Sequence, residues 1–307
     1  MTAHTRPLPA SAAPDGPVLA GPTRIRTAGA LRLLTWPALV ASGADAAVTT
    51  RDGGVSSGPY ATLNLSFSVG DEPARVLENR RRLAAALDAR PDDFVFARQV
   101  HGAGVRVVGQ ADRGSGAFAP DDAITDADAL VTTTPGVVLV ILAADCVPIV
   151  LHDPVAGVLA CVHAGWRGTV ARAGAAAIAA MQSLGSRPAD VIAGVGPAIA
   201  QDRYQVGPEV REAVAEAFGP DAEALIRPDP VPDRWRLDLW AANRMVLRDA
   251  GVGDARIHVT GLPTGPASGA ESGSGYFFSD RAARPCGRLA LVARLRAADR
   301  PPVDVTT

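Results

Sequence analysis

Hydrophobic residues along this chain follow two spacings, one typical of buried strands and one typical of amphipathic helices. The apolar runs at 137–144 and 158–162 are rich in β-branched residues and apolar on both faces, which predicts strands covered on both sides. Between Pro73 and Pro91 the apolar positions recur about every 3.6 residues, which predicts a helix over roughly 72–89. Strands and helices that follow one another indicate an α/β or α+β protein.

Shorter segments extend this pattern. Further strands are predicted near 46–50, 94–100, 105–108, 129–131, 149–151, 191–195, 257–259 and 289–294, and further helices after Thr169, over 208–218 and over 238–250. Residues 109–128 and 261–275 show no period, so we expect a mobile surface loop in the first and a flexible loop in the second. No repeat or linker divides the chain. We therefore expect one α+β domain with a mixed β-sheet core flanked by helices.

The two ends of the chain differ from its centre in composition. Residues 1–22 are rich in Ala, Pro and Gly, and they lack the continuous apolar segment of a signal peptide. We expect 1–45 to be largely a disordered tail that leads into a first strand, 46–295 to form the folded domain, and 296–307 to be frayed.

Charge and cysteine usage exclude several classes of function. Lys and Arg together number 30 and Asp and Glu 32, and both signs are interspersed, so we expect no nucleic-acid partner. No apolar run approaches the ~20 residues of a bilayer span, so we expect no membrane partner. The three cysteines, an odd number, argue for a reducing compartment, and we expect a cytoplasmic protein. Every basic residue is Arg, which excludes lysine Schiff-base chemistry.

Three separate segments end apolar runs with a residue that binds soft or borderline metals. These residues are His101 in 99–102, Cys146 in 144–146 and His163 in 163–169. Two imidazoles and one thiolate suit zinc best and leave a fourth tetrahedral position for water or substrate. Each residue alone would be an ordinary buried side chain, but strand ends that meet at one edge of a sheet are where α/β proteins bind ligands. We therefore predict a catalytic zinc site, with copper as the alternative metal.

Neighbouring residues are candidates to assist this site. Asp145 can turn back at the strand tip and accept a hydrogen bond from a ligating imidazole. Arg51 and Arg167 lie in glycine-bounded loops and can bind an anionic oxygen, although ordinary surface ion pairs are the competing interpretation. Cys161 could be a spare ligand, but a small core residue is the favoured interpretation.

Taken in order, these segments resemble the YfiH-like family, also described as laccase-domain or polyphenol-oxidase-like proteins and regarded as purine nucleoside phosphorylases. The resemblance covers roughly 46–295, the expected catalytic domain. It is carried by 50–56, 63–66, 79–80, 99–102, 144–148, 163–169, 196–199 and 277–279. The chain departs from the family where a usual Cys-Thr pair is missing near 260–261. It departs again where the usual Ser-Tyr-Arg-Arg reads Ser279-Asp280-Arg281-Ala282.

The resemblance implies a zinc ion held by His101, Cys146 and His163 beside a purine nucleoside pocket. It implies phosphorolysis of adenosine, inosine, guanosine and methylthioadenosine to free base and ribose 1-phosphate, together with deamination of adenosine. Purine nucleoside and phosphate would be the partners, and a monomer and a small homo-oligomer both stay open. The remaining residues expected in the site are Arg51, Asp145 and Arg167 for catalysis and Asn64, Gln99 and Phe278 for substrate binding, with Phe278 stacked on the purine.

Three other functions fit the same residues. Cys146 as nucleophile with His163 as its base would make a cysteine hydrolase, which metal would inhibit. A copper-dependent phenol oxidase would need further histidine ligands, which the five in this chain, one of them in the N-terminal tail, hardly supply. A non-catalytic protein would bind purines or metal without turnover.

Overall fold

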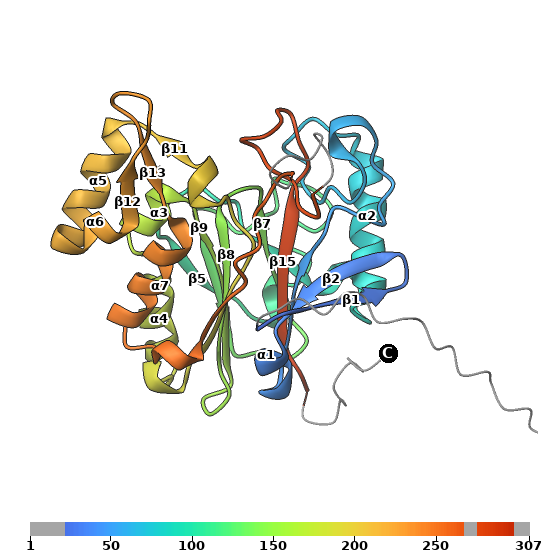
Figure 1. Ribbon diagram of the computed structural model, residues 1–307. Coiled ribbons are helices and arrows are strands. Elements are labelled where there is room, and N and C mark those ends of the chain that lie inside the picture. The colour runs from blue at the N-terminus through green and yellow to red at the C-terminus, as the bar shows by residue number, and fades with distance from the viewer. Residues whose placement is uncertain (1–21, 267–274, 298–307) are drawn as a thin grey trace, which may run out of the picture.

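Two six-stranded β-sheets lie face to face in the computed structural model, which describes residues 22–266 and 275–297 (Figure 1). The first sheet has the order β1 (Arg24–Ala28), β2 (Leu31–Thr35), β3 (Ala44–Thr49), β15 (Leu289–Leu295), β7 (Val138–Ala143) and β4 (Phe94–Phe96). The second has the order β14 (Ile257–Val259), β10 (Ile192–Val195), β8 (Val147–Asp153), β9 (Val158–Ala164), β6 (Ala129–Thr132) and β5 (Val105–Val107). Both sheets mix parallel and antiparallel pairs.

Helices cover the outer face of each sheet (Figure 1). On the first sheet this is α2 (Pro73–Ala86), and the short α1 (Pro37–Ala41) links β2 to β3. Over the second sheet lie α3 (Trp166–Val170), α4 (Ala173–Ser183), α5 (Pro208–Phe218), α6 (Ala222–Leu225) and α7 (Leu239–Asp249). A small sheet accompanies them, in the order β11 (Gln205–Val206), β13 (Trp235–Leu237) and β12 (Ile226–Pro228). In the described parts of the chain, no helix has the length and apolar character needed to cross a membrane.

Strand β9 shows why the apolar runs fold as central strands. All of its residues are buried, because its side chains alternate between two cores. Ala160 and Val162 pack under the helices, whereas Leu159 and Cys161 pack between the two sheets. Cys161 is therefore a core residue, as expected, and its burial raises the pKa of its thiol.

Most of the predicted elements are present. α5 and β14 have the predicted bounds, and α7 lies within its predicted range. α7 begins after Asp238, whose carboxylate accepts a hydrogen bond from the backbone N–H of Ala241. The expected α+β fold, with a mixed β core flanked by helices, is confirmed, although the core consists of two principal sheets. The helix predicted after Thr169 is two helices, α3 and α4, separated by Arg172 in the left-handed backbone conformation.

The expectation of a largely disordered segment over 1–45 is wrong for its described part. Residues 24–45 form β1, β2, α1 and the start of β3, because their apolar side chains complete the core of the first sheet. Trp36 is fully buried there, and its indole N–H donates to the carbonyl of His258 in the second sheet. The expected tails at 1–21 and 298–307 lie outside the described residues, as does the 267–274 part of the second predicted loop.

The segment 109–128 is anchored along β4 and is not a free surface loop. Its backbone pairs with Phe96, which donates to the carbonyl of Ser115 and accepts from the N–H of Ile124. Ala117 and Ala127 are buried, and the guanidinium of Arg80 donates to the carbonyl of Ala117 at 2.9 Å. A local pattern without a period could not reveal these long-range bonds.

A buried histidine at the other end of the second sheet makes stability depend on pH. Ser42 Oγ donates to the carbonyl of Leu39, so the Nδ1–H of His152 donates to Ser42 Oγ, at 2.8 Å. Burial lowers the pKa of His152 from 6.5 to about 4, with a smaller opposing effect of Asp153. The folded state thus binds this proton less readily than the unfolded chain, so its contribution is complete above pH 6.5 and is lost as the pH falls toward 4.

We predict that His152→Asn, which keeps a donor for Ser42 without a titrating ring, loses less stability on acidification than the wild type. The expected difference between pH 7 and pH 4 is about 3 kcal/mol, from the shift in pKa. Urea unfolding at both pH values measures it. Equal losses in the two proteins would contradict the role given to His152.

Candidate metal centre

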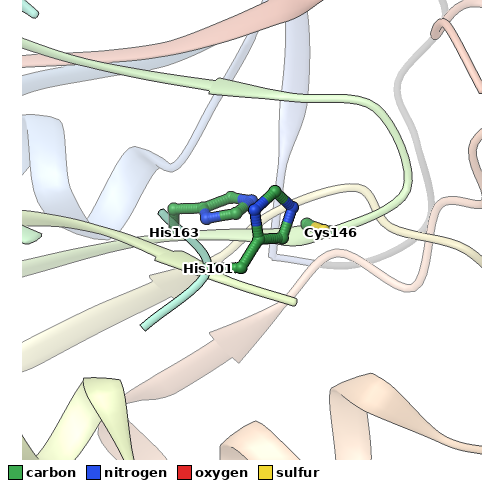
Figure 2. A group of neighbouring side chains, drawn as sticks. All are labelled: His101, Cys146 and His163. Carbon is green, nitrogen blue, oxygen red and sulfur yellow. The ribbon is translucent and has the colours of Figure 1, made fainter. Parts of the chain in front are cut away.

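His101, Cys146 and His163 converge at one end of the seam between the two sheets (Figure 2). Their ligand atoms lie within 4.8 Å of one another, and the two imidazole rings are nearly perpendicular, at 85°. His101 lies where the chain passes from β4 in the first sheet toward β5 in the second. Cys146 lies in the turn from β7 to β8, and His163 lies on β9. The meeting point is thus a corner between two sheets, whereas the sequence predicted one sheet edge.

Two of the backbone positions that form this corner adopt an unusual conformation. His101 has φ 61° and Asp145 has φ 85°, a region that costs energy for residues other than glycine. Hydrogen bonds stabilise the strained conformation of Asp145. The Asp145 carboxylate accepts from the hydroxyl of Thr264 and, at 2.7 Å, from the backbone N–H of Arg281, and its carbonyl accepts from Ile199. Asp145 therefore fixes the turn that presents Cys146.

A different aspartate supports the histidines. Asp128 is fully buried, and its carboxylate accepts hydrogen bonds from His163 Nδ1 at 2.9 Å and from the backbone N–H groups of Val100, His101 and Gly102. Burial opposes its charge, but these donors outweigh burial and hold its pKa below the usual value. With Nδ1 committed to Asp128, Nε2 of His163 is the nitrogen left for a metal. The imidazole–carboxylate bond expected at Asp145 is thus made by Asp128.

The electrostatics of the three residues suit a cation. Burial disfavours the Cys146 thiolate, but His163 and His101 outweigh burial and lower its pKa. Burial likewise disfavours a charged His163, yet Cys146 and Asp128 raise its pKa. A thiolate and two imidazoles form a donor set that fits a borderline metal such as zinc. We call His101, Cys146 and His163 the metal cradle.

Gly165 leaves the room that the metal cradle needs. Its φ is not in the left-handed region, so the backbone alone does not require glycine there. A Cβ at this position would lie 2.8 Å from Cys146 Sγ and 3.3 Å from Cδ2 of His101. The lack of a side chain therefore lets the start of α3 approach both side chains closely.

The metal cradle forms part of the wall of a cavity of about 720 Å³. Phe67, Trp166, Ile199 and Tyr204 supply apolar and aromatic surface. Positive charge exceeds negative charge in the described wall: it contains the arginines Arg80, Arg98, Arg167, Arg281, Arg284 and Arg288, and the acidic residues Asp121, Asp145 and Asp280. Such a cavity can hold a flat aromatic molecule together with an anion.

Three of the other predicted site residues lie in this wall. Asp145 and Arg167 line the cavity, and Gln99 lines it too. The side-chain amide of Gln99 is occupied, because it donates to the carbonyl of Leu142 at 2.7 Å and accepts from the N–H of Leu142 at 2.8 Å. Gln99 therefore ties the segment that carries His101 to the end of β7.

The remaining three are outside the wall. Asn64 is fully buried, and its amide bonds to Ser66, Asp71 and Arg288. Phe278 is 2% exposed and packs in the interior, and the guanidinium of Arg51 lies over its ring at 5.0 Å and donates to the carbonyl of Ala61. Asn64 and Phe278 thus pack in the interior next to the cavity wall, and Arg51 is partly exposed and contacts Phe278, so direct contact of these three residues with a ligand stays a prediction.

Sequence reasoning missed Asp128, Tyr204 and Arg281. Asp128 sits among several aspartates in an aperiodic segment, so nothing in the local pattern distinguishes it. Tyr204 and Arg281 reach the cavity from a 3-10 turn and from the segment before β15, far from the metal cradle in sequence. For Arg281 the sequence offered one signal, because this residue lies in 279–282, the segment set against the family's usual Ser-Tyr-Arg-Arg.

Known proteins resemble this chain both in sequence and in structure. Residues 45–296 match a family model described as "Multi-copper polyphenol oxidoreductase laccase". A "Purine nucleoside phosphorylase" of Deinococcus radiodurans is 48% identical over 228 residues, which are 74% of this chain and 82% of that protein. "Adenosine deaminase RL5" from an unknown prokaryotic organism is 40% identical over 70% of this chain and 82% of that protein. The crystal structure of YlmD from Geobacillus stearothermophilus superposes with a TM-score of 0.83, at 33% identity, over 90% of this chain and 100% of that one.

We predict that Asp128→Asn weakens zinc retention. An asparagine turns an NH₂ group toward backbone N–H donors, so at least one of the four bonds is lost and His163 is no longer fixed. The expected loss of zinc affinity is about tenfold to a hundredfold, measured by competition with a chelator. Asp126→Asn, at an exposed position two residues away, is the control. Equal affinities in the two variants would contradict the role of Asp128.

We predict that Gly165→Ala also lowers zinc affinity, by about tenfold or more, because its methyl group displaces Cys146 Sγ. The same competition assay measures this effect. Gly253→Ala is the matched control, since a Cβ there meets no atom within 4 Å. If both alanine variants bind zinc as the wild type does, the close approach at Gly165 has no part in shaping the site.

Proposed function

Because this chain belongs to the multi-copper polyphenol oxidoreductase laccase family, with relatives named purine nucleoside phosphorylase and adenosine deaminase, we propose that it is a zinc-dependent purine nucleoside phosphorylase that also deaminates adenosine. The substrates would be adenosine, inosine, guanosine or methylthioadenosine, together with phosphate. One observation carries the proposal: the metal cradle opens onto a large cavity with excess positive charge, so that a metal, an anion and an aromatic base can meet there.

Two reactions at one site require two different nucleophiles. In phosphorolysis an oxygen of HPO₄²⁻ bonds to C1′ while the bond from C1′ to the base nitrogen breaks, and the electron pair stays with the base. The proton of the phosphate balances the departing base, which gives free purine and ribose 1-phosphate. In deamination the oxygen of water bonds to C6 and the bond from C6 to the amino nitrogen breaks; one proton of the water goes to the departing amino group and the other to N1, which gives ammonia and inosine. Zinc, when bound, would supply Lewis acidity and an orienting charge for either nucleophile.

The residues of the chain supply position and charge. His101, Cys146 and His163 would hold the metal, and Asp128 fixes the orientation of His163. Arg167 is exposed in the cavity wall, with its guanidinium over the ring of Trp166 at 4.3 Å, and would bind a phosphate oxygen. Asp145 acts as a positioning residue, because its carboxylate holds the neighbouring segments and not a reactant.

Zinc fits this donor set better than the copper that the family description suggests. Two His and one Cys also occur in blue-copper sites, but those sites add a weak axial ligand such as methionine. No methionine lines the described cavity, and the metal cradle is the one His, Cys, Asp and Glu group of ligating geometry among the described residues. Cys146 and His163 each favour the charged form of the other, which would also suit a cysteine hydrolase. The experiment below must therefore distinguish the zinc enzyme from a cysteine hydrolase.

We predict that protein purified without added metal contains about one zinc per chain, and that His101→Ala and Cys146→Ala lose at least ~10³-fold in both phosphorolysis and deamination. Metal analysis and product chromatography with adenosine, with and without phosphate, measure these quantities.

Other results would identify a different function. Faster turnover after metal removal would favour the cysteine hydrolase, and bound copper with phenol oxidation would favour the oxidase. Purine binding without any product would indicate a non-catalytic protein. Each of these outcomes contradicts the proposed function.

A further inference from the structure

The arginines in the cavity wall differ in whether their charge is already satisfied. The side chain of Arg80 is buried against the carbonyls of Leu65, Gly116 and Ala117, and it is therefore part of the wall structure. Another pair of guanidiniums, those of Arg284 and Arg288, both bind the carboxylate of Asp280. Arg167 and Arg281 have no carboxylate partner among the described residues, so their charge is available to a ligand.

Arg281 is held in place from two sides. Its backbone N–H donates to Asp145 Oδ2 at 2.7 Å, and one guanidinium nitrogen donates to the carbonyl of Gln205 at 2.9 Å. The guanidinium carbon lies 5.3 Å from the ring centre of Tyr204. A guanidinium has five N–H donors, so this anchoring leaves several of them for a ligand in the cavity.

Tyr204 lines the same cavity as these arginines and the metal cradle. Burial raises the pKa of its phenol, and the nearby charges that act on it are Cys146 and Asp145 in the same direction and Arg281 and Arg167 in the opposite direction. The phenol therefore lies close enough to all four to feel their charge. Its hydroxyl keeps its proton at neutral pH and can donate it in a hydrogen bond.

We propose that Arg281, Arg167 and the Tyr204 hydroxyl form the subsite that holds the phosphate nucleophile beside the metal cradle, and that this subsite sets the balance between phosphorolysis and deamination. The inference rests on the proposed function. At neutral pH phosphate carries between one and two negative charges and several acceptor oxygens, which two unpaired guanidiniums and a hydroxyl satisfy. Water is neutral and needs none of this charge, so the two reactions depend differently on the subsite.

Arg98 is the other position that phosphate could use. Its side chain is exposed, lines the cavity and makes no contact with an acidic side chain in the described structure. It follows β4 in the first sheet, however, and among the described residues its guanidinium has no hydrogen bond or ring contact that holds it in place, unlike that of Arg281. The observations therefore favour the Arg281 side, and Arg98 serves as the competing location in the test.

The experiment compares the zinc-loaded wild type with Arg281→Gln and Tyr204→Phe. Phosphorolysis is followed with inosine, which has no amino group to lose, and deamination is followed with adenosine in phosphate-free buffer. We expect Arg281→Gln to raise the KM for phosphate about tenfold or more, and to reduce phosphorolysis at least tenfold more than deamination. Tyr204→Phe shifts the same ratio in the same direction. Titration calorimetry with orthophosphate measures binding directly.

Arg244→Gln is the control, because it removes an arginine that is bound to Asp254 and lies outside the cavity wall, and its KM for phosphate should stay within about twofold of the wild type. An equal loss of both reactions in Arg281→Gln would overturn the inference, as would a selective phosphate defect in Arg98→Gln. A wild type without phosphorolysis would defeat the proposed function. In that case the subsite would still be supported if the wild type binds orthophosphate and Arg281→Gln does not.

Discussion

Four hydrogen bonds to one buried carboxylate hold the metal cradle together. Asp128 binds the backbone N–H groups of residues 100–102, on a segment that leaves the first sheet, and His163 on the second sheet. A buried carboxylate is stable only when it is well bonded, so each of these donors is needed. One side chain thereby fixes where His101 stands, how the ring of His163 is turned, and how the two sheets meet at the end that carries the cavity.

Local pattern was sufficient for the central strands and the long helices. β8 and β9 are apolar on both sides because each lies between two cores, and α5 and α7 have clear terminal residues. Local pattern could not show that β15 pairs with β3 and with β7, because these pairings join distant parts of the chain. The same limitation explains why β1 and β2 were missed. Their apolar side chains form part of a core only when both strands pair within the first sheet.

The residues of the site likewise differ in whether local pattern could reveal them. His101, Cys146 and His163 were visible because each ends an apolar run, and a strand end is a place where side chains can converge. Arg51, Asn64 and Phe278 were expected in the site because they lie in glycine-rich or motif-like segments, yet none of them lines the described cavity, and Asn64 and Phe278 are buried. Asp128 could not be found from sequence, since its importance comes from four donors that only the folded chain brings to it.

X-ray absorption at the zinc edge tests the account most directly, because it identifies the atoms around the metal without reference to turnover. One sulfur and two imidazole nitrogens are expected among the zinc neighbours of the wild type. A zinc shell without sulfur, or one made of oxygen atoms alone, would contradict it.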